Sequence, residues 1–328
     1  MQRALATVMA EPKLGALQYG WPEGDEKLRS WIAKRIGVRA DDVIVTAGAQ
    51  QAIALATSMI PRGGTIGVAP ATYPAALELF ATQGLTPSEG SSVDAFYLVP
   101  EIGNPEGLPL EEDLAETVRT SSVPVIADDA YAELRFDGTR TRVADRFSRV
   151  WRIGTFAKTL CPGLRVGWLV PPPEYRALVL RLKHDADLQA NGLGQAVLAE
   201  LLRNWDYDAH LGRARQFYAR RASALAGALR RHLPSWTFRE PDGGFSFFVD
   251  TNTTGNDVAF LAVASANGVS FDPGRMFRVV PSDRIELRLC HCNVGEPLLE
   301  EGAKRLARAW SAFTSGSCGA PRSDCRPA

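Results

Sequence analysis

The sequence predicts an α/β protein with a seven-stranded, mostly parallel sheet in a large domain, followed by a smaller α+β domain at the C-terminal end. Between residues 42 and 170, short β-branched segments alternate with longer amphipathic ones, which is the pattern of helices crossing over between parallel strands. After the three prolines at 171–173, long helical stretches rich in Ala, Leu and Arg replace this alternation. Strands and helices mix again in the last third of the chain, which indicates the second domain.

Residue type and periodicity predict each element. Runs of β-branched and apolar residues predict the seven strands of the large sheet at residues 43–46, 65–69, 85–88, 95–99, 123–128, 149–154 and 165–170. Apolar residues at helical spacing predict helices at 49–59, 73–83, 174–204 and 206–232. In the last third of the chain, the same criteria predict strands at 236–238, 245–249 and 284–290 around helices at 257–267 and 297–313.

These elements divide the chain into four segments. Residues 1–22 form an N-terminal segment, and residues 23–205 form the large α/β domain. Residues 206–313 contain a connector helix and the small α+β domain. Residues 314–328 are rich in Ser, Gly and Pro, and we expect them to be a disordered tail.

Composition and charge exclude several classes of protein. The chain has 328 residues with 37 basic and 37 acidic side chains, so we expect no surface built to bind nucleic acid or anionic lipid. Its five cysteines are scattered and odd in number, which favours a reducing compartment over a disulfide framework. No apolar run approaches the roughly 20 residues that cross a membrane. These features predict a cytoplasmic protein without a membrane anchor.

The segment between the sixth and seventh strands carries the strongest chemical signal. Residues 154–167 read Gly-Thr-Phe-Ala-Lys-Thr-Leu-Cys-Pro-Gly-Leu-Arg-Val-Gly, which places Lys158 and Arg165 at the carboxyl edge of the sheet. Open α/β sheets bind their ligands at that edge. A lone lysine in a loop is more often a solvated charge than a catalyst, so the residues that accompany Lys158 decide its interpretation.

This segment resembles the lysine signature of the fold-type I pyridoxal-phosphate enzymes, specifically the class I/II aminotransferases. The signature Ser/Thr-x-x-Lys-x-x-x-Pro-Gly-x-Arg-x-Gly is matched by Thr155, Lys158, Pro162, Gly163, Arg165 and Gly167. The resemblance implies that Lys158 forms a Schiff base with pyridoxal 5'-phosphate, and that Arg165 and the Thr155 hydroxyl bind its phosphate. The residue types suit these roles, since lysine forms imines and a guanidinium matches a phosphate dianion.

The end of the fifth strand matches a second block of the family. Residues 127–131 read Ala-Asp-Asp-Ala-Tyr, and Asp128 with Tyr131 resembles the family's Asp-x-x-Tyr. The resemblance places Asp128 at the pyridine nitrogen of the cofactor and Tyr131 at its phenolic oxygen. A carboxylate beside that nitrogen keeps it protonated, which makes the ring an electron sink. Taken alone, Asp128 or Asp129 could instead cap the next turn.

Three further matches lie along the same domain. Asn104 opens an Asn-Pro-Glu-Gly segment that resembles the family's Asn-Pro-x-Gly, and the resemblance implies contacts with the phenolic oxygen and the substrate. Gly48, Ala49 and Gln50 join the first strand to the first helix, where free N–H groups and the helix dipole favour a phosphate. Tyr73 matches the aromatic residue that stacks on the cofactor ring, although an aromatic there could equally belong to the core.

Two matches lie nearer the ends of the chain. Tyr19, in Leu-Gln-Tyr-Gly, matches the tyrosine that reaches the cofactor phosphate of a neighbouring subunit. The resemblance therefore implies a homodimer with shared active sites, with residues 1–22 at the dimer contact. Arg288, in the strand predicted at 284–290, matches the arginine that binds the substrate α-carboxylate bidentately. Arg284 is the alternative, because period-two counting puts it on the same face of that strand.

The Cys290-His291-Cys292 sequence could suggest a metal site. Alternate residues of a strand point to opposite faces, so we expect His291 to turn away from the two sulfur atoms. We therefore predict that the protein holds no metal.

The ordered set of matches predicts an aminotransferase that moves an amino group from an L-amino acid to a 2-oxo acid. The first alternative is a pyridoxal-phosphate oxidase, lyase or decarboxylase, because the same residues support those reactions. The second is a non-catalytic, effector-binding domain of a transcriptional regulator, although we expect the sixteen residues before Leu17 to be too few for a winged helix. Trp21, near Tyr19, suggests an apolar or aromatic substrate.

Overall fold

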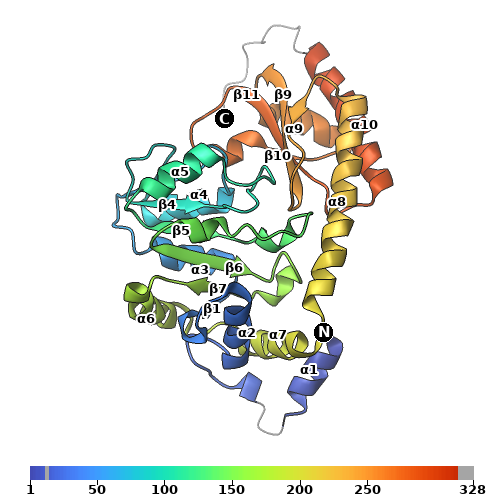
Figure 1. Ribbon diagram of the computed structural model, residues 1–328. Helices are drawn as coiled ribbons and strands as arrows, with labels where there is room; N and C mark the ends of the chain where they lie inside the picture. Colours follow the sequence, from blue (N-terminus) through green and yellow to red (C-terminus); the bar gives the residue numbers. More distant parts are fainter. Residues whose placement is uncertain (12–14, 317–328) are drawn as a thin grey trace, which may run out of the picture.

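The large sheet contains seven strands, as the sequence predicts (Figure 1). The computed structural model describes residues 1–11 and 15–316 of the chain. In chain order the strands are β1 (Ile44–Thr46), β2 (Thr65–Gly67), β3 (Thr86–Ser88), β4 (Ala95–Leu98), β5 (Val125–Asp128), β6 (Val150–Thr155) and β7 (Gly167–Val170). Their spatial order is β1-β7-β6-β5-β4-β2-β3. All neighbours are parallel except β7, which runs antiparallel to β1 and β6, so the mostly parallel sheet is confirmed.

Helices cover both faces of this sheet, which explains why its strands are apolar along their whole length. Every residue of β4 and β5 is buried. The helices α3 (Ala49–Thr57), α4 (Pro74–Gln83) and α6 (Arg176–Asp187) pack on one face. The opposite face is covered by α2 (Glu26–Ile36), α5 (Glu112–Thr120) and α7 (Gly192–Asn204).

The long helix predicted at 174–204 is interrupted in the structure. Leu188 adopts a positive φ of 57°, and α6 has ended at the preceding residue. The next helix, α7, begins after Asn191, whose side chain accepts a hydrogen bond from the backbone N–H of Gly194. An asparagine cap followed by glycine is a helix start signal, and the amphipathic pattern on either side of it hid the break.

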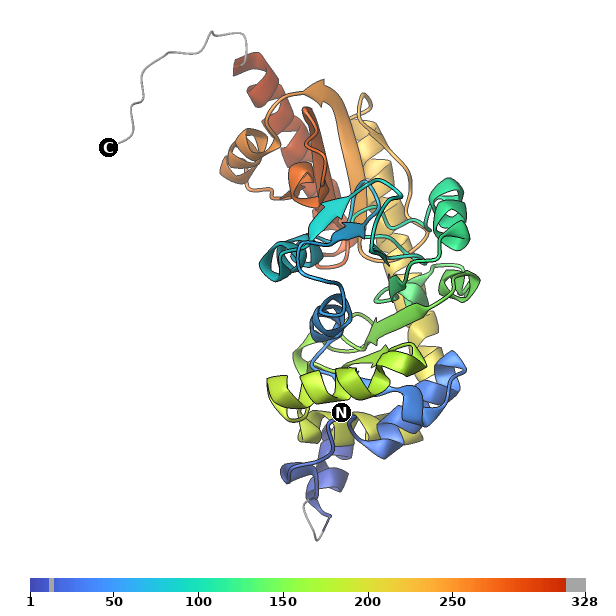
Figure 2. The ribbon, with the colours of Figure 1, turned by 90° about the vertical axis from the view of Figure 1, so that its left-hand side faces the viewer.

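Helix α8 (Tyr207–His232) joins the two domains, and Figure 2 shows it running along both of them. Tyr207 and Leu211 at its start belong to the core of the large domain. Leu225 and Leu229, near its end, belong to the core of the small domain. One rigid helix therefore carries the small domain against the carboxyl edge of the large sheet.

The small domain contains an antiparallel sheet in the order β10-β11-β9-β8. Its strands are β8 (Thr237–Phe238), β9 (Ser246–Thr254), β10 (Asp272–Pro273) and β11 (Arg284–Cys290). Its helices are α9 (Asp257–Ala266) and α10 (Glu296–Gly316). Strand β10 is too short for a sequence pattern to predict, yet it pairs Asp272 with Arg288 and so decides the surroundings of that arginine.

Both ends of the chain contain helix beyond the prediction. Helix α1 (Gln2–Met9) buries Ala4 and Val8 against Val197 of α7. Helix α10 continues to Gly316, three residues into the predicted tail, and the rest of that tail lies outside the described residues. Within residues 1–11 and 15–316, no helix is both long and apolar enough to cross a membrane.

Candidate active site

The predicted residues of the large domain converge on one cavity at the carboxyl edge of the sheet. The cavity has a volume of about 580 Å³ and is open to solvent at its mouth. It is lined by Ala49, Gln50, Tyr73, Val99, Asn104, Asp128, Ala130, Tyr131, Thr155, Ala157, Lys158 and Arg165. Parallel strands end at the same edge of a sheet, so residues that are distant in the sequence meet there.

One end of the cavity is built to hold an anion. Gly48 caps α3 at a φ of 102°, and a Cβ atom on it would lie 2.8 Å from the Arg165 guanidinium. A Cβ on Gly167 would in turn lie 2.7 Å from the backbone of Gly48, so only glycine fits at either position. The guanidinium of Arg165 donates to the carbonyl of Ala47 at 3.0 Å. The start of α3 and a cation therefore face the same space, as a phosphate requires.

The lysine segment forms the next wall. Thr155 accepts a hydrogen bond from the N–H of Ala157 at 3.1 Å and donates to the carbonyl of Val166 at 3.2 Å. These bonds hold the turn that carries Lys158 into the cavity. The Nζ atom of Lys158 lies 5.3 Å from the ring centroid of Tyr131, so the amine faces the aromatic wall.

Asp128 lies at the floor of the cavity and is almost fully buried. Burial raises the pKa of its carboxyl group, while hydrogen bonds from Tyr97 and from the N–H of Ala130 act in the opposite direction. The Tyr97 hydroxyl donates to it at 2.9 Å, and the Ala130 N–H at 3.2 Å. A buried carboxylate with fixed donors is suited to hold a cationic ring nitrogen beside it.

Two buried amide oxygens indicate that the cavity accepts a polar ligand. Oδ1 of Asn104 and Oε1 of Gln50 have no hydrogen-bond partner among the described residues. Buried polar groups are rarely left unsatisfied, so each such atom needs an explanation. Together with the anion site at Arg165, the amine of Lys158 and the carboxylate of Asp128, they fit a phosphorylated pyridine aldehyde.

Arg288 of the small domain does not line this cavity and instead lines a separate hollow in its own domain, but its hydrogen bonds lead to the cavity's edge. Its Nε donates to the hydroxyl of Ser246 at 3.2 Å, and that hydroxyl donates to the carbonyl of Pro105 at 2.9 Å, next to Asn104. Its Nη1 donates to Asp272 at 2.8 Å. Burial raises the pKa of Tyr131 to about 12, and the positive charge of Arg288 is the main influence that opposes this rise. The charge of Arg288 therefore acts on Tyr131, a residue that lines the cavity.

Arg284, the alternative to Arg288, has a different environment. Its guanidinium makes two hydrogen bonds to Asp250, at 2.6 and 2.9 Å, and one to Asn252. The pairing of β11 with β9 shifts between Arg284 and Glu286. Of the two arginines, Arg288 is the one that contacts residues next to the cavity.

The comparison with known families identifies the protein's class. The sequence model described as "Aminotransferase class I and II" matches residues 98–306, well over half of the chain. The chain belongs to this family. It is a pyridoxal-phosphate-dependent aminotransferase, so the predictions of fold, cofactor and reaction class are confirmed.

Individual aminotransferases are similar over nearly the whole chain. The chain is 31% identical to the 2-aminoadipate transaminase of Thermus thermophilus, over 93% of this chain and 84% of that protein. It is 30% identical to aromatic-amino-acid aminotransferase 1 of Thermococcus litoralis, over 89% of this chain and 79% of that protein. The solved structure of LysN, an alpha-aminoadipate aminotransferase of Thermus thermophilus in complex with N-(5'-phosphopyridoxyl)-L-leucine, superposes with a TM-score of 0.85 at 29% identity, covering 96% and 88% of the two chains.

Gly48 and Arg288 lie next to the cavity without lining it, and two further predicted residues of this aminotransferase lie away from it. Tyr19 is 86% exposed and Trp21 is 77% exposed, and neither lines the cavity of its own chain. A large aromatic side chain on the surface of one chain is available to a second chain. Their predicted contacts would therefore have to form between subunits.

Sequence reasoning missed the residues that hold the site in place. Lys183 is fully buried, and its Nζ donates to Asp187 at 2.8 Å. Asp187 also accepts from Gln51 at 2.8 Å, and Gln51 accepts from the N–H of Ala47, the residue that binds Arg165. Tyr97, which donates to Asp128, was equally unforeseen. A lysine and an aspartate four residues apart on one helix were the available signal, but they indicate a surface pair as readily.

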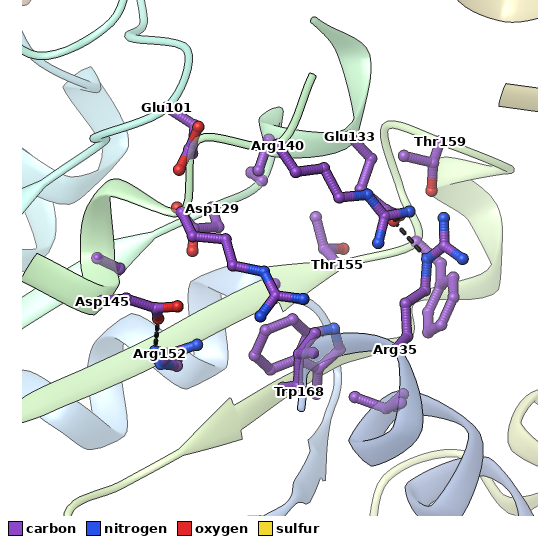
Figure 3. Close-up of a pocket in the computed structure, with 18 of the residues that line it drawn as sticks. Arg35, Glu101, Asp129, Glu133, Arg140, Asp145, Arg152, Thr155, Thr159 and Trp168 are labelled. Carbon is purple, nitrogen blue, oxygen red and sulfur yellow. Dashed lines mark hydrogen bonds and ion pairs between the residues drawn. The ribbon is translucent and has the colours of Figure 1, made fainter. Parts of the chain in front are cut away.

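A second, larger cavity lies between α2, β6, β7 and the segment after β5 (Figure 3). It has a volume of about 870 Å³, and of the predicted site residues only Thr155 lines it. Several of its charged side chains are paired, since Arg35 and Arg140 pair with Glu133 and Arg152 pairs with Asp145. No lysine is among the described residues that line it, so it lacks the amine that the aminotransferase reaction needs.

Proposed function

We propose that Lys158, Asp128, Tyr131 and Arg165 are the working residues of this aminotransferase, and that Arg288 selects its substrates by their α-carboxylate. The observation that carries the proposal is the single cavity in which the amine of Lys158, the carboxylate of Asp128 and the anion site at Arg165 face one another. Each group suits one part of pyridoxal phosphate: the amine its aldehyde, the carboxylate its pyridine nitrogen and the anion site its phosphate.

The phosphate would be held by the N–H groups of Gly48, Ala49 and Gln50 at the start of α3, with Arg165 and Thr155 beside them. Asp128 would accept a hydrogen bond from the protonated pyridine nitrogen. Tyr131 and Asn104 would donate to the phenolic oxygen, and Tyr73 would cover the ring. Tyr73 packs against the core cluster beneath α3 and α4, and this packing restrains the position of its ring.

When bound, pyridoxal phosphate withdraws electrons from the substrate Cα and so makes its C–H bond acidic. Lys158 would hold the cofactor through Nζ until a substrate amine displaces it. The freed amine would then take the proton from the substrate Cα. Arg288 would hold the α-carboxylate and so orient the substrate for removal of that proton.

We also propose a homodimer with shared active sites, with Tyr19 of one subunit near the cofactor phosphate of the other. The exposure of Tyr19 and Trp21 supports this arrangement. Trp21 would then line the partner's pocket and favour apolar or aromatic side chains. A cytoplasmic location agrees with free thiols at Cys161, Cys290 and Cys292.

Absorbance spectroscopy tests the proposal directly. Purified wild-type protein and the Lys158→Ala variant are mixed, without oxygen, with a panel of L-amino acids that includes 2-aminoadipate and the aromatic residues. We expect the wild-type imine band to be replaced by the band of the aminated cofactor, with one equivalent of 2-oxo acid formed. Release of carbon dioxide or ammonia, or a requirement for oxygen, would contradict the proposed roles. Size-exclusion chromatography with light scattering tests the dimer.

A further inference from the structure

Two thiols lie beside Arg288 and have no role in the reaction proposed above. Cys290 is the last residue of β11, and its sulfur atom accepts a hydrogen bond from Nη1 of Arg288 at 3.3 Å. The chain leaves the strand after Cys290, and the thiol of Cys292, which donates to Oδ1 of Asn293 at 3.2 Å, lies close enough to Cys290 to act on the pKa of its thiol. Strand alternation predicts that His291 turns away from both sulfur atoms, but it does not predict that the two sulfur atoms lie near each other.

The surroundings make Cys290 a nucleophile. Hydrogen bonding from Cys292 and the positive charge of Arg288 lower the pKa of the Cys290 thiol to about 6. Cys290 is exposed to solvent, so a small oxidant can reach it. Cys292 is half-buried, and its thiol is the protonated member of the pair because its pKa is raised by the same contact. A reactive thiolate next to a second thiol is the arrangement of a dithiol redox site.

The segment around the pair is held on both sides. The N–H of His291 donates to the carbonyl of Phe245 at 2.9 Å, and the guanidinium of Arg221 on α8 donates to the carbonyl of Cys292. His291 itself is fully buried. These contacts anchor the backbone, so a bond between the two sulfur atoms requires only their side chains to move.

We propose that Cys290 and Cys292 are a modification site, at which a hydroperoxide converts the two thiols to an intramolecular disulfide and thereby removes a negative charge from beside Arg288. The Cys290 thiolate attacks the peroxide, the O–O bond breaks, and the leaving alkoxide or hydroxide takes a proton. The Cys292 thiol then attacks the sulfenic sulfur, forms the S–S bond and releases water. The two sulfur atoms lose two electrons, and the peroxide gains them.

The consequence for substrate binding rests on the proposed role of Arg288. In the reduced protein Arg288 faces two anions, the Cys290 thiolate and the carboxylate of Asp272. An incoming α-carboxylate must displace one of them, unless the thiolate has taken up a proton from solvent. In the disulfide form only Asp272 remains, so amino acids should bind more tightly. The charged and titratable groups that act on the pair, from every side for which a contact is described, are Arg288, Asp272, Tyr131, Tyr218 and Arg221.

Mass spectrometry tests the modification without reference to activity. A holoenzyme with Cys161, Cys318 and Cys325 changed to Ser retains only the pair. After hydrogen peroxide and then iodoacetamide, we expect a peptide that has lost two hydrogen atoms and resists alkylation until dithiothreitol is added. In the same background Cys292→Ser should accumulate a sulfenic acid at Cys290, which dimedone traps. The proposal would be overturned if Cys290 were oxidised without forming a disulfide in the protein that has both thiols. It would also be overturned if neither thiol were oxidised.

Steady-state kinetics then tests the link to Arg288. Between pH 6 and pH 8 the KM of the reduced enzyme for its amino acid should rise by up to about fifty-fold, because the protonated fraction of a thiol with a pKa of about 6 falls from about one half to about one hundredth. The disulfide form and Cys290→Ser should lose this rise, whereas Cys161→Ser should keep it. A disulfide that forms without changing this pH dependence would refute the link to Arg288. An unchanged KM in Arg288→Lys would instead show that the proposed role of Arg288 is wrong.

Discussion

The two sides of the active-site cavity are built in different ways. The large domain supplies groups at the ends of strands, where sheet register fixes them, and Asp128 is only 4% exposed. The small domain supplies one long side chain, Arg288, whose partner Asp272 has a side chain that is 49% exposed. Burial and backbone geometry hold the first side, whereas exchangeable ion pairs hold the second. The cofactor side is therefore fixed, and the substrate side can adjust to what it binds.

The largest effect is expected on the fixed side, where one group has no substitute. Replacing Lys158 with Ala removes the amine that we propose moves the Cα proton, and we expect kcat to fall by about 10⁴-fold or more. Single-turnover measurements with added methylamine separate lost chemistry from misfolding, since a small amine should restore part of the rate. Retention of more than about a hundredth of the wild-type kcat would contradict the assignment of this lysine.

On the adjustable side, the two arginines of β11 provide a matched pair. Replacing Arg288 with Lys keeps the charge but loses the two-pronged contact with a carboxylate, so we expect kcat/KM to fall by about 100-fold. Replacing Arg284 with Lys affects its contacts with Asp250 and Asn252 and should change kcat/KM by less than about three-fold. If kcat/KM fell equally in both variants, the two arginines of β11 would contribute equally to substrate binding, against the difference in their surroundings.

Behind the adjustable side, a buried histidine limits stability in acid. Burial and the positive charges of Arg221 and Arg288 lower the pKa of His291 to about 4. The unfolded chain takes up a proton near pH 6.5, so the stability that this neutral ring supports is present above that pH and is lost as pH falls toward 4. Between pH 7 and pH 5 the loss should be about 2 kcal/mol.

Urea unfolding of His291→Phe measures this contribution. The variant should lose about 2 kcal/mol less than the wild type between pH 7 and pH 5. His184→Gln changes a histidine whose side chain is 56% exposed, and it should follow the wild-type pH dependence. If His291→Phe also follows the wild type, the buried ring is not the group that titrates.

The smallest effect is expected from a supporting residue on the fixed side. Replacing Tyr97 with Phe removes the hydroxyl that donates to Asp128, and the pKa of that carboxyl should then rise further. We expect kcat to fall by about five- to ten-fold, as the loss of one charged hydrogen bond predicts, with the acid limb of the pH profile moved to higher pH. Tyr175→Phe is the control, because its hydroxyl bonds Arg149 before β6, away from the carboxyl edge. If the acid limb of the pH profile stayed at the same pH in Tyr97→Phe, Tyr97 would have no influence on the pKa of Asp128.

Local pattern accounts for most of what could be predicted. The strands of the large sheet and the residues at their ends follow from apolar runs and short motifs, and parallel strands bring such ends together wherever they lie in the sequence. The family, the cofactor and the reaction class were confirmed on that basis. The break between α6 and α7 was missed because both helices continue one amphipathic pattern.

The sequence by itself determined the large sheet, the class of chemistry and the set of residues that meet at the cofactor cavity. Only the tertiary structure decided which arginine of β11 contacts residues next to the cavity, that Tyr97 and Lys183 bond to residues around it, and that Cys290 and Cys292 lie near each other beside Arg288. The physical reason is that these contacts depend on strand register and on the docking of the small domain through α8. Register and docking arise from packing between residues far apart in the chain, which local periodicity does not encode.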